Sequence, residues 1–398
     1  MPWSVPDPMS IRLQFVAEAL RGVRPIVAVC AAYGISEKTG QKWLARFRAF
    51  GLPGLAERSH APATCPHRTP APQRAALLAC RRAHPTWGAR KLRAACQAAA
   101  PALAWPAPST ITTLLAEAGL LAPRRRRPRA RLDRTDRGPA HAAAPNDLWT
   151  LDYKGQFRTG DGRWCYPFTI VDAATRMLLA CVAHPAPGTT AAQRVLARCF
   201  RTYGLPLAIL SDNGAPFGAV HAPRGLSRLS CWFAALGITP RFTVPGHPEH
   251  NGRHERLHRT LKAEATSPPA ATRRAQQARF DAWRAEYNTV RPHAALDDQP
   301  PASRYQSSAT PYPRGGPPPL VYPSHFVARR VTQAGLIWWQ QHDIYISQAF
   351  TGYTLGLAPV SATCHDVYLA DLLLGSVDLS ARRFIPLTEA LRSPINPG

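Results

Sequence analysis

Leu148-Trp149-Thr150-Leu151-Asp152 is the stretch that decides the fold, because it has the pattern of a buried β-strand that ends on a carboxylate. A second apolar run, Ile209-Leu210-Ser211, is followed in the same way by Asp212. A third acid, Glu255, lies among arginines in a segment with helical spacing, 253–262. Acids are few in this strongly basic chain, so acids at these places indicate ligands for hard cations.

The chain has 398 residues, with 49 Lys and Arg against 24 Asp and Glu and a formal charge of +25. This excess is beyond what solubility requires and indicates a polyanionic partner. It is concentrated in residues 1–140, which hold 23 basic and 7 acidic side chains. Nine cysteines without a C-x-x-C pair are expected to be small buried residues, neither zinc ligands nor disulfides. No signal peptide or long apolar run is found, so we expect a cytoplasmic, nucleoid-associated bacterial protein with no membrane partner.

Residues 1–60 predict a helix-turn-helix DNA-binding domain. Helices are expected over 11–20 and 26–33, and after a turn a third helix is expected over 37–50. The exposed side of this third helix suits phosphates and base edges through four side chains, Lys38, Gln41, Lys42 and Arg46. An ordinary three-helix bundle with a solvated basic side is the alternative.

Residues 70–122 predict a second helix-turn-helix or winged-helix-like domain. Helices are expected over 73–84, 89–99 and 111–118, with Ser109-Thr110 as caps of the last one. Because Ala-rich helices also form plain packing units, a purely structural role is the alternative.

An arginine-rich segment, residues 123–144, follows. Four consecutive arginines stand near its start, Arg124, Arg125, Arg126 and Arg127. Such a segment is too polar to fold alone, so we expect a linker that tracks DNA phosphates, with a solvated spacer as the alternative.

Residues 145–305 predict a mixed α/β domain in which three antiparallel strands are followed by alternating helices and strands. The strands are expected over 147–153, 164–172, 177–183, 207–211 and 238–243, and the helices over 189–203, 226–236 and 250–265. In that arrangement Asp152 lies on the first strand, Asp212 follows the fourth strand, and Glu255 projects from the last helix.

These motifs, in this order, resemble the insertion-sequence branch of the DDE transposases, whose ribonuclease H-like core is shared with retroviral-type integrases. Residues 149–152, 211–214 and 246–262 are similar to the family's Trp-Thr-x-Asp, Ser-Asp-Asn-Gly and Gly-His-Pro-x-x-Asn-Gly-x-x-Glu-Arg-x-His-x-x-Leu-Lys patterns. Residues 287–296 are similar to its closing Tyr-Asn-x-x-Arg-Pro-His-x-x-Leu pattern. The resemblance implies that the catalytic, metal-binding triad is Asp152, Asp212 and Glu255.

The resemblance has one departure. The 42 residues between Asp212 and Glu255 exceed the roughly 35 of the family's common name, and 221–224 has the character of a loop insertion.

The chemistry of phosphodiester cleavage explains why a triad of carboxylates would be needed. Phosphodiester cleavage needs a deprotonated nucleophile and a stabilised leaving oxygen, and two divalent ions held by carboxylates supply both. We expect two Mg²⁺ or Mn²⁺ ions, bridged by Asp152 and each held also by Asp212 or Glu255. Four cations on the Glu255 helix are expected to hold the DNA strand beside the ions, Arg253, Arg256, Arg259 and Lys262. A solvated helix face is the alternative for any one of them.

Other residues compete for these roles. Asp172 and Glu249 occupy strand-end and turn positions, which attract carboxylates for capping alone. The stretch His254-Glu255-Arg256-Leu257-His258 matches the H-E-x-x-H pattern of zinc metalloproteases. Because a peptidase would explain neither the charge nor the two acid-bearing strands, we expect His258→Ala to keep DNA cleavage.

Residues 320–392 follow a Pro-rich linker and predict a small β-barrel domain. Short β-type runs are found over 326–331, 336–339, 344–346, 353–357, 367–369 and 372–377. The expected fold class is therefore multidomain, with tandem all-α helix-turn-helix domains, an α/β ribonuclease H-like core and an all-β barrel-like C-terminal domain.

The expected function is that of a DNA transposase. It would bind the terminal repeats of its element as a homo-oligomer, nick double-stranded DNA to free a 3′-OH, and join that hydroxyl to target DNA by transesterification. A DNA-binding regulator with an inactive integrase fold is the alternative, and metal-dependent nicking separates the two.

Overall fold

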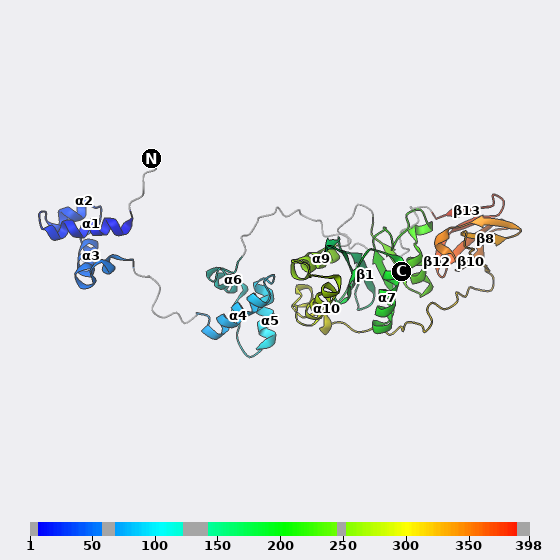
Figure 1. Cartoon of the computed structure of the whole chain (residues 1–398), viewed down its shortest axis with the longest axis horizontal. Coiled ribbons are helices and arrows are strands. Elements are labelled where there is room, and N and C mark those ends of the chain that lie inside the picture. The colour runs from blue at the N-terminus through cyan, green and yellow to red at the C-terminus, as the bar shows by residue number, and fades with distance from the viewer. Residues whose placement is uncertain (1–6, 58–67, 122–141, 245–251, 388–398) are drawn as a thin grey trace. The chain divides into compact units, whose positions relative to one another are not determined.

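The computed structural model describes residues 7–57, 68–121, 142–244 and 252–387. The chain divides into two compact units, 1–68 and 69–398, and each is described by itself (Figure 1). Several predicted features lie outside the described residues, namely Arg124, Arg125, Arg126, Arg127, most of the arginine-rich segment, Glu249 and the 246–251 part of the Gly-His-Pro motif. Among the described helices, none combines the length and the apolar character needed to cross a membrane. The eight described cysteines are free, and six of them are buried.

The first unit is a three-helix domain, as predicted. It contains α1 (Pro8–Arg21), α2 (Ile26–Ala32), α3 (Glu37–Phe50) and a short 3₁₀ helix, η1 (Leu52–Leu55). Ser36 caps α3 by accepting a hydrogen bond from the backbone N–H of Thr39 at 3.3 Å. Gly40 lies against Phe15 and Cys30, where an added Cβ would collide with both side chains, so glycine lets α3 pack closely on α1 and α2.

The second unit begins with another set of three helices, α4 (Ala71–Ala83), α5 (Ala89–Ala99) and α6 (Pro108–Glu117). They enclose a core that includes Trp87 and Leu92. The predicted caps of the third helix were wrong, because Ser109 and Thr110 lie inside α6, which starts at Pro108. Proline is favoured in the first turn of a helix because its fixed φ suits helical backbone and its missing N–H would have no partner there.

A mixed six-stranded sheet forms the middle of the second unit. Its strands are β1 (Leu148–Tyr153), β2 (Phe157–Arg158), β3 (Trp164–Asp172), β4 (Leu178–His184), β5 (Ala208–Ser211) and β6 (Thr239–Phe242). The order is β2-β3-β1-β5-β6, with β4 also paired to β3. β1 runs antiparallel to β3 and parallel to β5, and β5 runs parallel to β6. The predicted strands are confirmed, and the two-residue β2 is an addition.

Helices cover both faces of this sheet. The helices are α7 (Thr189–Tyr203), α8 (Arg228–Ala235), α9 (Gly252–Ala265) and α10 (Arg273–Thr289). α7 and α8 share one core cluster with Trp149 and Leu151, whereas α9 and α10 pack on the opposite face, against Val171 and Leu178 (Figure 1). Since successive side chains of a strand point to opposite faces, Thr150 and Asp152 belong to the α9 face.

The closing Tyr-Asn-x-x-Arg-Pro-His motif has a structural role at this face. The Asn288 amide accepts from the N–H of Leu178 and donates to its carbonyl, both at 2.9 Å, which attaches α10 to β4. Arg291 pairs with Glu264 of α9, with Nη1 2.6 Å from Oε2, and Trp283 donates to the same carboxylate at 2.8 Å. These contacts join the end of α10 to the helix that carries Glu255.

The C-terminal part of the second unit is all-β, as predicted. Its strands are β7 (Val327–Arg330), β8 (Leu336–Trp339), β9 (His342–Tyr345), β10 (Thr354–Pro359), β11 (Cys364–Leu369), β12 (Leu372–Asp378) and β13 (Arg383–Pro386). Five of them form an antiparallel sheet of order β13-β12-β11-β10-β7, and β8 and β9 form a hairpin that contacts both edge strands. This arrangement is only loosely barrel-like, because the hairpin is a separate two-stranded sheet.

The predicted loop insertion contains a short 3₁₀ helix, η2 (Pro223–Gly225). Arg224 in it donates from Nη1 to the carbonyl of Leu373 on β12 at 3.1 Å. Leu226 and Cys231, which follow the insertion, belong to the hydrophobic core of the β-strands. The extra residues between Asp212 and Glu255 therefore serve as an attachment for the C-terminal strands.

Candidate active site

Two of the predicted triad members lie at the ends of neighbouring parallel strands. β1 and β5 pair in parallel with Thr150 opposite Leu210, and Asp152 and Asp212 each lie two residues further along. The carboxyl ends of parallel strands meet at one edge of a sheet, so this register brings the two acids together. Asp212 is more exposed to solvent than Asp152, which is half-buried.

The pKa of Asp152 depends on the charges of the other two acids, Asp212 and Glu255. Burial, together with the negative charges of Asp212 and Glu255, raises the pKa of Asp152 to about 7. Burial also raises the pKa of Asp212. Carboxylates that repel one another in a partly desolvated site are stabilised by a cation, so this group fits a divalent metal.

Glu255 lies in the first turn of α9, on the exposed side of the helix. Its neighbour His254 is buried and bonds to both central strands of the sheet. Nδ1 of His254 lies 3.0 Å from Oγ1 of Thr150, and Nε2 lies 2.6 Å from Oγ1 of Thr169. These two contacts fix the start of α9 on β1 and β3, next to Asp152.

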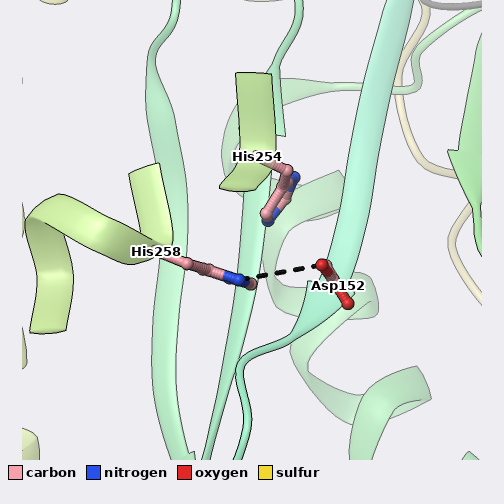
Figure 2. A group of neighbouring side chains, drawn as sticks. All are labelled: Asp152, His254 and His258. Atoms are coloured by element: carbon pink, nitrogen blue, oxygen red, sulfur yellow. Dashed lines mark ion pairs between the residues drawn. The ribbon is translucent and has the colours of Figure 1, made fainter. Parts of the chain in front are cut away.

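His258 lies one helical turn after His254, and both point toward β1 in Figure 2. Its Nε2 is 2.9 Å from Oγ1 of Thr169, and its Nδ1 is 3.7 Å from Oδ2 of Asp152, the contact drawn as a dashed line. Burial and the charge of Lys154 lower the pKa of His258 to about 4, so the imidazole is neutral at neutral pH. The contact with Asp152 is an ion pair only when the imidazole is protonated, which this low pKa disfavours at neutral pH.

Asp152, His254 and His258 form a group of three possible metal ligands within the described ranges. Sequence reasoning left both histidines outside the site, although the H-E-x-x-H spacing already placed them on one helical face. The zinc-protease interpretation is not supported by the contacts. The Thr169 hydroxyl lies between the two Nε2 atoms, in the place where that motif requires zinc.

The rival acid Asp172 is fully buried and has a capping role. Its carboxylate accepts from the backbone N–H of Thr175 at 2.8 Å, from the Thr175 hydroxyl at 2.6 Å, and from the N–H of Asn146 at 2.8 Å. It closes the turn between β3 and β4 and lies outside the candidate site.

The predicted DNA-contacting residues are mostly exposed. On α3, Lys38, Gln41 and Lys42 are exposed, while Arg46 is half-buried and stacks over the ring of Trp43 at 5.0 Å. On α9 the four predicted cations are all exposed, Arg253, Arg256, Arg259 and Lys262. Arg253 also donates to the carbonyl of Ala173 at 3.3 Å, which ties it to the sheet.

Family models match most of the regions discussed above. Residues 142–248 and 236–301 each match a model described as an integrase core domain. Residues 11–63 match a helix-turn-helix domain, and 39–115 match a homeodomain-like domain. An α/β core preceded by DNA-binding helical domains is therefore supported by both the sequence families and the strand order.

Relatives of this chain come from bacterial insertion elements. A 31.7 kDa protein of insertion element IS407 from Burkholderia multivorans is 30% identical over 203 residues, which cover 50% of this chain and 70% of the relative. A 39.2 kDa protein of insertion element IS476 from Xanthomonas euvesicatoria is 29% identical over 164 residues, which cover 40% of this chain and 44% of that protein.

Among solved structures, the catalytic core of BIV integrase is 20% identical with a TM-score of 0.31, over 40% of this chain and 93% of that one. The HTLV-2 integrase core in complex with magnesium is 14% identical with a TM-score of 0.31, over 42% of this chain and 100% of that one.

Proposed function

Because this chain belongs to the insertion-element family of integrase-type transposases, we propose that it cuts the ends of its element and joins the freed 3′-OH to target DNA. The observation that carries the proposal is the convergence of carboxylates at one sheet edge. Asp152 and Asp212 end adjacent parallel strands, and the charge of Glu255 acts on Asp152 from α9. Such a group of acids on a chain of +25 suits a reaction at a polyanion.

Each residue of the proposed triad has a distinct role. Asp152 would bridge two ions, while Asp212 and Glu255 would each hold one, and Mg²⁺ or Mn²⁺ fits their oxygen donors. When bound, the ions would lower the pKa of the attacking hydroxyl or water and stabilise the leaving oxygen. The α9 cations would hold the phosphodiester strand beside the carboxylates, and the buried His254 would keep Glu255 in register with the sheet.

The proposed function is tested by incubating the full chain with a duplex of its element's end. Strand nicking that requires Mg²⁺ or Mn²⁺, followed by joining to a second duplex, is the expected result. Specific binding without cleavage in either metal would favour the alternative, a DNA-binding regulator with an inactive core.

We expect a fragment of residues 1–140 to bind DNA without metal and with a steep salt dependence. Neutralised phosphates release counterions, so three phosphate contacts predict a loss of affinity of roughly fortyfold between about 50 and 200 mM salt. Fluorescence anisotropy with a labelled duplex measures this slope. An affinity that does not change over this range would remove the electrostatic argument.

We expect sequence preference to depend on α3. Gln41 can pair bidentately with adenine, and Lys38 lies one turn earlier on the same exposed side, so their replacement by alanine should reduce the preference for element ends by about 1–3 kcal/mol per lost base contact. Neutralising Arg124 to Arg127 should instead weaken binding of end and random DNA by a similar factor, since phosphate contacts carry no sequence information. Competition binding at fixed salt separates the two effects. An unchanged preference in the α3 variant would assign base reading to another helix, with α6 as the next to test.

Assembly on two element ends requires more than one protomer, so we propose a homo-oligomer in the DNA complex. A cytoplasmic, nucleoid-associated location stays a prediction.

A further inference from the structure

The imidazole of His258 faces the carboxylate of Asp152 with its Nδ1 atom. The two side chains are 12% and 22% exposed, and 3.7 Å separates Nδ1 from Oδ2 (Figure 2). An imidazole that binds a metal does so through a nitrogen without a proton, so its other nitrogen carries the proton. The contacts of Nε2 therefore decide whether Nδ1 of His258 can be that donor atom.

The hydrogen bonds of the Thr169 hydroxyl determine which ring nitrogen of His258 carries the proton. Its Oγ1 lies 3.2 Å from the carbonyl of Asp152, 2.6 Å from Nε2 of His254 and 2.9 Å from Nε2 of His258. A hydroxyl has one proton and two lone pairs, and a carbonyl can only accept. All three contacts are hydrogen bonds at the same time only when Thr169 donates to Asp152 and both imidazoles donate Nε2–H to Thr169.

The two histidines then differ in what their Nδ1 atoms meet. Nδ1 of His254 lies 3.0 Å from the hydroxyl of Thr150, which also contacts the carbonyl of Val171 at 3.4 Å. Nδ1 of His258 presents its lone pair to Asp152, and at 3.7 Å the two atoms are too far apart for a hydrogen bond but near enough for one cation to contact both.

We infer that His258 is a further ligand of the divalent ion that Asp152 binds, with Nδ1 as the donor atom, and that it shifts the preference of the site from Mg²⁺ toward Mn²⁺. The inference rests on the proposed function, which supplies the ion at Asp152. Because metal bonds to nitrogen or oxygen are about 2.0–2.2 Å long, one ion can contact two atoms that are up to roughly 4.4 Å apart, and the 3.7 Å between Nδ1 and Oδ2 is shorter than that limit. Mg²⁺ prefers oxygen, whereas imidazole suits transition-metal ions.

Pulsed EPR of Mn²⁺ bound to the full chain tests the ligand directly. Protein labelled with ¹⁵N-histidine should differ from unlabelled protein in the nitrogen coupling of the bound ion. His258→Gln and Asp152→Asn should each lose this coupling, whereas His325→Gln, which changes an exposed histidine of the C-terminal part, should keep it. Binding titrations should show that His258→Gln weakens Mn²⁺ by at least about tenfold, the size expected for loss of a metal contact, and Mg²⁺ by less.

Two outcomes would overturn the inference. One is bound Mn²⁺ in the unmodified chain without any histidine coupling, and the other is a coupling that persists in His258→Gln. The isotope comparison uses the unmodified protein, so a folding defect in the variant does not weaken the test. Cleavage assays on the same preparations keep the two proposals separate. Cleavage without nitrogen coupling contradicts only the ligand assignment, and nitrogen coupling without cleavage contradicts only the proposed function.

Discussion

Replacement of any one triad carboxylate should abolish strand cleavage while binding of element-end DNA stays nearly intact. Asp152→Asn, Asp212→Asn and Glu255→Gln each remove a proposed metal ligand and leave the α3 and α9 cations in place. Charge stabilisation by a bound ion contributes several kcal/mol to the transition state, and about 4 kcal/mol corresponds to a factor of roughly a thousand in rate. Cleavage of an end-labelled duplex in Mg²⁺ measures the rate, and an electrophoretic shift measures binding.

Asp172→Asn is an unsuitable control because its carboxylate closes a turn by accepting three hydrogen bonds. Glu37→Gln changes an exposed acid at the start of α3, outside the proposed metal site, and should keep cleavage near the wild-type rate. A triad variant that cleaves at that rate would show that the residue has been assigned wrongly.

The core strands could be predicted almost to the residue, because burial on both faces produces continuous apolar runs and polar turns bound them. The helix α10 was missed although Phe280, Trp283 and Tyr287 recur at helical spacing. Only one narrow side of this helix is apolar, so the hydrophobic periodicity of this long polar segment is weak. The Tyr-Asn-x-x-Arg-Pro-His motif covers only its end.

The contacts around Asp152 could be predicted only in part. The H-E-x-x-H spacing placed two histidines on one face of α9, but it could not say what they meet. Their partners Thr150 and Thr169 lie 104 and 85 residues away from His254, and both depend on the register of β1 with β3 and on where α9 crosses the sheet. Long-range register of this kind is set by tertiary packing and leaves no local pattern in the sequence.

Asp152 should also make the metal-free protein less stable as the pH rises. Its pKa is about 7 in the folded chain against an ordinary value of 3.8, so the folded state favours the protonated carboxyl. Ionisation therefore costs the folded state free energy between about pH 4 and pH 7, and the cost is constant above that range. Each factor of ten in an ionisation constant is about 1.4 kcal/mol, so the full cost is about 4 kcal/mol.

Asp152→Asn removes this cost, and we expect the variant to be more stable than the wild type at about pH 8 but equal to it near pH 4. Denaturant unfolding in EDTA, followed by tryptophan fluorescence, gives the difference at each pH. Mn²⁺ should reverse the ranking at about pH 8, because the ion stabilises the ionised carboxylate that the variant lacks. Equal stabilities at both pH values without metal would mean that Asp152 is better solvated than its contacts imply. If Mn²⁺ leaves the difference in stability between the wild type and the variant unchanged, Asp152 holds no ion. An ionised Asp152 is repelled by Asp212 and Glu255, so an ion bound there would stabilise the wild type.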